Sequence, residues 1–148
     1  MEPVIDVQQA ALIDALNEDL AREFQAIIRY TQFAASAHGP FRPQLAQLFR
    51  AEISDELGHA QFLADKVAAL GGKPITVVPP VEPAYEPRDM LERVVAAERE
   101  DVELYTQRAE EAERAGDLAL KVQLENMIAD ETRHLEEMRK ILAGWPTR

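Results

Sequence analysis

The chain has 148 residues, 47% of them apolar, and a formal net charge of −11 at pH 7. That is enough for one domain with its own hydrophobic core. The charge disfavours contact with nucleic acid or anionic lipid, and it either favours attraction of cations or serves solubility alone. The absence of cysteine excludes disulfides and metal sites held by thiolates. There is no signal-peptide pattern and no apolar run of membrane-spanning length, so a soluble cytoplasmic protein is expected.

A short arm, residues 1–5, is followed by a predicted helix from Asp6, which is suited to cap it, to about Ala37. Gly39-Pro40 then stops the helix. Apolar residues recur in steps of three and four, the spacing of a helix packed in a bundle. Glu23 falls on this stripe, where a free carboxylate is costly to bury. The stripe is Leu16, Leu20, Glu23, Ile27, Tyr30 and Ala34.

A second helix is predicted between Pro40/Pro43 and Gly71-Gly72. Three successive positions of its otherwise apolar stripe are polar, and a need for solubility does not explain polar residues on the buried face. Glu52, the first of the three, lies one turn before Glu56 and could line an access path for metal. The stripe is Leu45, Phe49, Glu52, Glu56, His59, Leu63, Val67 and Leu70.

Residues 73–87 contain five prolines and the extended run Ile75-Thr76-Val77-Val78, so this segment cannot be helical. It is long for a loop, but a crossover along the length of a helical bundle needs about this many extended residues. The alternative is a linker between two independent hairpins. Because neither hairpin could bury its apolar face alone, a single domain over residues 1–148 is preferred.

Pro87 suits the first position of a third helix that Gly116 closes, and Asp117 can cap a fourth that ends near Gly144. The predicted fold is an all-α antiparallel four-helix bundle with a long crossover between the second and third helices and no fifth helix. The two stripes are Leu91, Val95, Glu98, Val102, Tyr105, Ala109 and Ala112, and Leu120, Leu124, Met127, Glu131, His134, Met138 and Ile141.

The motif Asp-Glu-x-x-His occurs twice, at residues 55–59 and 130–134. Residues three apart share a helical face, so each motif directs a carboxylate and an imidazole the same way. A further Glu precedes each motif at an equal spacing, since 56 − 23 = 33 and 131 − 98 = 33. The chain therefore consists of two similar helical hairpins. Each supplies one Glu and one Glu-x-x-His, the ligand set of a dinuclear metal site in a four-helix bundle.

Four carboxylates buried together repel one another and are costly to desolvate unless cations balance them. Two divalent cations balance the four charges and leave both imidazoles as neutral donors. Carboxylate and imidazole ligands without sulfur suit iron or manganese, with zinc as a substitute. By the symmetry of the pattern, two glutamates should bridge the metals. The predicted ligands are Glu23, Glu56, His59, Glu98, Glu131 and His134, with Glu56 and Glu131 as the bridges.

Five neighbouring residues are harder to assign. Asp55 and Asp130 are each expected to accept the second ring N–H of the histidine in the opposite motif. Tyr30 is either a core aromatic or a hydrogen-bonding partner and local electron donor at the site, and we include it among the catalytic candidates. Tyr105, its counterpart, is interpreted as a core aromatic. Asp101, three residues past Glu98, is left open and could be a solvated helix residue.

These motifs resemble the ferritin-like superfamily, and within it the bacterioferritins. The resemblance covers almost the whole chain and is carried by Leu16-Asn17 with Glu23, by Glu98 and by the two Asp-Glu-x-x-His motifs. It implies a ferroxidase that oxidises Fe(II) with O2 or H2O2 at two irons per subunit, and a shell of 24 or 12 identical subunits that stores or detoxifies iron. Tyr30 matches a tyrosine beside the site in that family.

Two departures narrow the expectation. Leu57 stands where bacterioferritins carry the haem-ligating Met, so no haem is expected. The chain ends 14 residues past His134, too soon for the fifth helix of the 24-subunit shell, so a Dps-like 12-mer or a smaller homo-oligomer is expected. The alternatives are a non-storage diiron oxidase, a rubrerythrin-type peroxidase with Asp101 in place of that family's additional Glu, and a structural bundle whose polar core only sets helix register.

Overall fold

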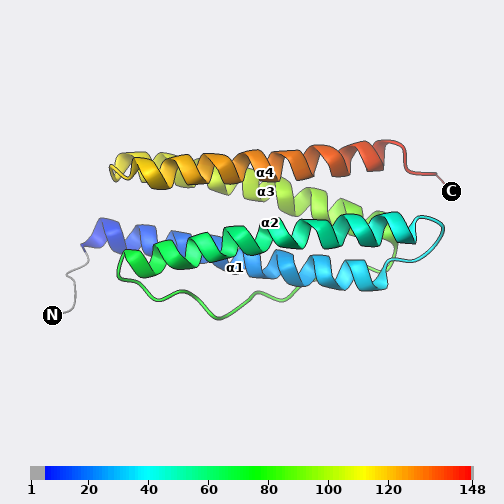
Figure 1. Cartoon of the computed structure of the whole chain (residues 1–148), viewed down its shortest axis with the longest axis horizontal. Helices are drawn as coiled ribbons and strands as arrows, with labels where there is room; N and C mark the ends of the chain where they lie inside the picture. Colours follow the sequence, from blue (N-terminus) through cyan, green and yellow to red (C-terminus); the bar gives the residue numbers. More distant parts are fainter. Residues whose placement is uncertain (1–5, 148) are drawn as a thin grey trace.

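A computed structural model of the chain describes residues 6–147, and its regular secondary structure there is entirely helical (Figure 1). The helices are α1 (Val7–Ser36), α2 (Arg42–Ala69), α3 (Pro87–Arg114) and α4 (Leu118–Ala143). The predicted all-α class and the four predicted segments are confirmed. The arm predicted at residues 1–5 lies outside the described residues. None of the described helices is long and apolar enough to cross a membrane.

The predicted capping residues set the helix ends. The Asp6 carboxylate accepts the backbone N–H of Gln9 at 2.7 Å at the start of α1. Asp117 accepts that of Leu120 at 3.0 Å at the start of α4. Gly116, between α3 and α4, has a φ of +76°, a conformation that strains any residue with a Cβ atom.

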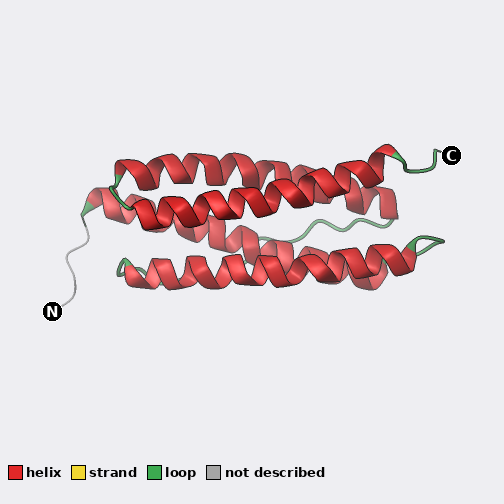
Figure 2. Cartoon of the chain, turned by 45° about the horizontal axis from the view of Figure 1, so that its top comes forward, coloured by secondary structure: helices red, strands yellow, loops and turns green. Residues whose placement is uncertain are grey.

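The four helices form two antiparallel hairpins, α1 with α2 and α3 with α4, packed side by side (Figure 2). The hairpins meet along α1–α3 and along α2–α4. Residues 72–85 have no regular secondary structure and run along the bundle as the predicted crossover (Figure 1). The Asn17 side chain on α1 anchors the crossover by donating to the carbonyl of Lys73 at 3.0 Å and accepting from the N–H of Ile75 at 2.9 Å.

The buried apolar side chains form two clusters, one toward each end of the bundle. The first cluster includes Leu16, Leu63 and Leu124, and the second includes Phe33, Phe49 and Met90. Along every helix, the predicted metal ligands fall between the residues of the two clusters. The bundle therefore holds a buried polar layer near its middle, enclosed by apolar packing on both sides.

Candidate metal centre

All six predicted ligands converge in this polar layer. Two groups of side chains offer ligand atoms that lie within 4.8 Å of one another. Glu56 and Glu131 belong to both groups, as expected for bridging residues. The groups are Glu23, Glu56, His59 and Glu131, and Glu56, Glu98, Glu131 and His134.

The two imidazoles direct one nitrogen toward the carboxylates. Nδ1 of His59 lies 3.0 Å from Glu131 Oε1 and 3.4 Å from Glu23 Oε1. Nδ1 of His134 lies 3.3 Å from Glu56 Oε1. The side chains of Glu56 and Glu131 are fully buried. A cation between these groups would be shielded from water, and its attraction to the carboxylates is stronger in such a buried site than in water.

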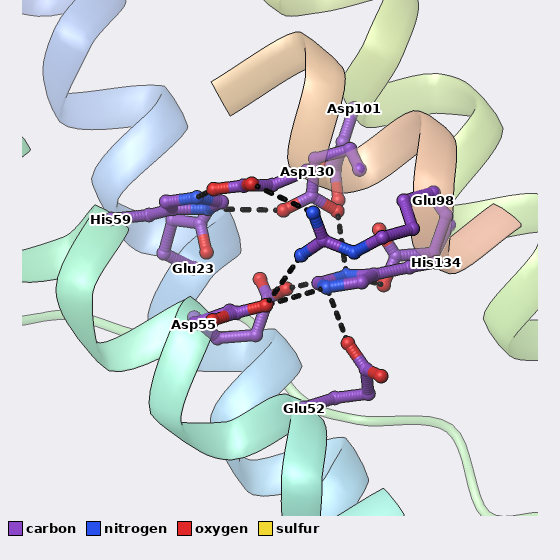
Figure 3. Close-up of polar contacts among 12 residues, drawn as sticks. Glu23, Glu52, Asp55, His59, Glu98, Asp101, Asp130 and His134 are labelled. Carbon is purple, nitrogen blue, oxygen red and sulfur yellow. Dashed lines mark hydrogen bonds and ion pairs between the residues drawn. The ribbon is translucent and has the colours of Figure 1, made fainter. Parts of the chain in front are cut away.

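The opposite nitrogen of each imidazole meets an aspartate of the other motif (Figure 3). Nε2 of His59 lies 2.9 Å from Asp130 Oδ2, and Nε2 of His134 lies 2.9 Å from Asp55 Oδ2. The predicted cross-pairing of the aspartates is confirmed. Such a contact places the proton on Nε2 and leaves Nδ1 free to bind a metal.

Arg133 is a contributor that sequence reasoning missed. Its guanidinium donates to Asp55 Oδ2 at 3.1 Å and to Asp130 Oδ1 at 3.4 Å, so one cation joins the two aspartates that hold the imidazoles. Gly58 occupies the corresponding position of the first motif. Because only one half carries the arginine, the repeated pattern gave no signal for it.

Both tyrosines bind ligand carboxylates. The hydroxyl of Tyr30 donates to Glu98 Oε1, and that of Tyr105 donates to Glu23 Oε1. The interpretation of Tyr105 as a core aromatic alone was therefore wrong, since it has the same kind of contact as its counterpart. Burial, together with the neighbouring carboxylates, raises the pKa of both phenols, so they remain protonated donors.

The crowding of charge shifts the pKa values of the groups themselves. Burial and the negative charge of Glu23 raise the pKa of Glu56 well above its usual value. Burial lowers the pKa of His59, but the nearby negative charge of Glu23, helped by Asp130, outweighs burial and raises the pKa to about 9. The pKa of His134 is raised because its carboxylate partners, Glu52 first, outweigh burial in the same way. Without metal, protons on Glu56, His59 and His134 therefore offset part of the negative charge of the clustered carboxylates.

The unpaired polar atoms test whether the site suits a metal. Nine buried side-chain oxygen and nitrogen atoms of the described residues have no hydrogen-bond partner. Eight of them belong to the six predicted ligands, including Nδ1 of both histidines, and the ninth is Oε2 of Glu52. Unpaired buried polar atoms are costly and rare in folded proteins. Their concentration at one point, with oxygen and imidazole donors, fits two divalent cations.

Other buried charges lie beside the centre but outside both groups. Asp101 accepts the Nε–H of Arg22 at 2.7 Å, and burial, with the charge of Glu98, raises its pKa to about 7 despite that arginine. Asp101 is buried and is thus not a solvated helix residue.

A second buried ion pair joins Arg108 to Asp19. Arg108 donates to both carboxylate oxygens of Asp19, at 2.7 and 3.1 Å, and the sequence pattern did not indicate this pair. Its only sequence signal is that Asp19 lies one turn before Glu23 on α1.

Known proteins give an independent comparison. The ferritin family, described as a ferritin-like domain, matches residues 13–147. A bacterioferritin from Rhodobacter capsulatus is 28% identical over 128 residues, which cover 86% of this chain and 80% of that protein.

Two solved structures share the fold. A ferritin-like, diiron-carboxylate protein from Bacillus anthracis is 44% identical with a TM-score of 0.91, over 93% of this chain and 99% of the other. The Desulfovibrio desulfuricans bacterioferritin, whose structure describes a diiron site, is 26% identical with a TM-score of 0.81, over 92% and 80% of the two chains.

Proposed function

Because this chain belongs to the ferritin-like domain family, we propose that it is a ferroxidase that binds two iron ions in the bundle and oxidises Fe(II) with O2 or H2O2. The observation that carries the proposal is the set of buried, unpaired carboxylate and imidazole atoms at one point of the core. The diiron-carboxylate and bacterioferritin relatives support the choice of iron over manganese or zinc.

The ligand assignment follows the two groups of side chains. Glu56 and Glu131, which belong to both groups, would bridge the two metal ions. Glu23 and His59 would complete one position, and Glu98 and His134 the other. Both histidines bind through Nδ1, because Nε2 of each is engaged with an aspartate. Two Fe(II) ions held there would each give up one electron and become Fe(III). The two electrons, with two protons from solvent, would reduce O2 to H2O2 or H2O2 to two water molecules.

The chain itself positions the ligands and handles protons. Asp55 and Asp130 keep the imidazoles oriented and hold their protons on Nε2. Tyr30 and Tyr105 fix one oxygen of Glu98 and of Glu23, which leaves the other oxygen of each carboxylate free for metal. Tyr30, buried beside the centre, is also the proposed local electron donor. The ligand protons must leave as metal binds, so metal affinity rises with pH.

We also propose storage or detoxification of the oxidised iron by a homo-oligomer of twelve or fewer subunits. Large apolar side chains that are exposed on three helices support association of the chain with copies of itself. They include Ile28, Leu57 and Val122, which are 43%, 46% and 54% exposed.

Aerobic loading of the purified chain with Fe(II), followed by gel filtration, tests the proposal. Many more than two irons retained per chain are expected for a storage shell. About two would keep the centre but favour a non-storage diiron enzyme, and none would overturn the proposal. Glu131→Ala should abolish oxidation while leaving the helical circular dichroism intact. If Glu131→Ala oxidised Fe(II) normally, the bridging assignment would be wrong.

One alternative loses support from the geometry. A rubrerythrin-type peroxidase would use an additional carboxylate three residues past Glu98. Asp101 occupies that position, but Arg22 binds it and it belongs to neither ligand group.

A further inference from the structure

The two halves of the centre have matching ligands but different surroundings. Glu52 lies four residues before Glu56 on α2, and the residue four before Glu131 on α4 is Met127. Met127 is buried in one of the apolar clusters. Glu52 instead lies beside His134, the histidine of the Glu98 half (Figure 3). The His134 half of the centre therefore has the carboxylate of Glu52 nearby, whereas the equivalent residue for the His59 half is the thioether Met127.

Oε2 of Glu52 forms an ion pair with His134 but accepts no hydrogen bond. The contact is with Nε2 of the imidazole and lacks the geometry of a hydrogen bond. That nitrogen already pairs with Asp55 Oδ2 at 2.9 Å. A neutral imidazole bound to metal through Nδ1 carries a single N–H, so it cannot serve both carboxylates. Nε2 of His59, by contrast, faces Asp130 alone.

Glu52 is placed to meet an arriving cation. Its side chain is 14% exposed, between the more open Asp55, at 41%, and the buried His134, at 2%. Ligand atoms of these three residues lie within 4.8 Å of one another. Among the described residues, Oε2 of Glu52 is the single buried side-chain oxygen or nitrogen without a hydrogen-bond partner outside the six proposed ligands. A mostly buried carboxylate that accepts no hydrogen bond is stabilised by a nearby cation.

We propose that Glu52 supplies an additional cation-binding carboxylate to the His134 half of the centre, so that the two metal positions bind with unequal affinity. The inference rests on the proposed dinuclear centre and adds the order in which its two positions bind metal. The His134 position fills first and the His59 position second. Met127 offers no such charge, so the inequality arises from one residue.

Titration of the chelator-treated protein with Co(II), followed by visible absorption, tests this inference. Wild-type protein is expected to bind two Co(II) per chain in two separate steps. Glu52→Met copies the residue of the other half and should weaken the first step about tenfold, as typical for residues that support a metal ligand, and merge the steps. Glu52→Gln keeps the shape, loses the charge and should weaken the same step.

A second readout separates metal binding from a structural role. Without metal, Glu52→Met removes a carboxylate from a crowded group in which His134 keeps Asp55 as a partner, so the melting temperature should change little while the Co(II) affinity falls. Glu136→Gln, which removes an exposed α4 carboxylate, is the matched control and should change neither.

The outcomes separate this inference from the proposed function. Two Co(II) bound by wild type, with both dissociation constants unchanged in Glu52→Met and Glu52→Gln, would overturn the role of Glu52 and leave the dinuclear centre in place. Wild-type protein that bound no Co(II) would overturn the centre and, with it, this inference.

Discussion

Without metal, the protein should lose stability as the pH rises from 6.5 to 9. The reason is His59, whose pKa rises from 6.5 to about 9 because Glu23 and Asp130 outweigh the effect of burial. The folded state therefore holds this proton more tightly than the unfolded state does. The resulting stabilisation is complete below pH 6.5 and is lost as the pH rises through 9.

A rise from 6.5 to about 9 corresponds to about 3 kcal/mol, since one pKa unit is worth about 1.4 kcal/mol. The imidazole is 8% exposed, so solvent screening reduces this figure little. Two other groups act in the same direction. The raised pKa of His134 has the same sign, and Glu56, also raised, disfavours the fold as its carboxyl ionises.

Urea denaturation at several pH values, with a chelator present, measures the effect. The free energy of unfolding should fall by a few kcal/mol between pH 6.5 and 9, and His59→Gln should flatten the slope. Excess Co(II) should reverse the trend, because metal competes with protons for the same atoms. A free energy of unfolding that stayed constant or rose over this range without metal would refute the account of the buried charges.

Three further changes probe the supports of the centre. Asp130→Asn should lower Co(II) affinity about 10–100-fold in a folded chain, and unchanged affinity would remove the aspartate from the site. Arg108→Ala should lower the free energy of unfolding in urea by about 3–5 kcal/mol, because the buried carboxylate of Asp19 loses its cation. The double variant Asp19→Leu with Arg108→Met, which replaces the ion pair with apolar side chains, should recover most of that stability. A double variant as unstable as Arg108→Ala would contradict this explanation. Tyr105→Phe should cost about 1–3 kcal/mol without metal, because Glu23 loses its donor, and less with metal; an equal cost in both states would argue for packing alone.

The helix positions and the convergence of the six candidate ligands were predictable because both depend on local pattern. Steps of three and four residues identify the buried face of a helix, and Asp6, Pro87, Gly116 and Asp117 mark helix ends by their backbone chemistry. The duplicated motif then places the carboxylates on that face. Five prolines between the hairpins predicted the crossover for the same local reason.

Contacts between helices were less predictable, since periodicity identifies a buried face but not the side chain opposite it. Tyr105 looked like a core aromatic until α1 brought Glu23 against its hydroxyl. Arg133 lies on an exposed position, and its role appears only when α2 places Asp55 beside it. For Glu52, the pattern marked a polar core residue, and only the structure shows that Asp55 leaves it without a donor.

The most direct test of the dinuclear centre is a crystal structure of the chain loaded anaerobically with Fe(II), with the metals located by anomalous scattering at the iron edge. We expect two iron peaks per chain, both contacting Glu56 and Glu131, with His59 on one and His134 on the other. A single peak away from these residues, or none at all, would contradict the proposed centre.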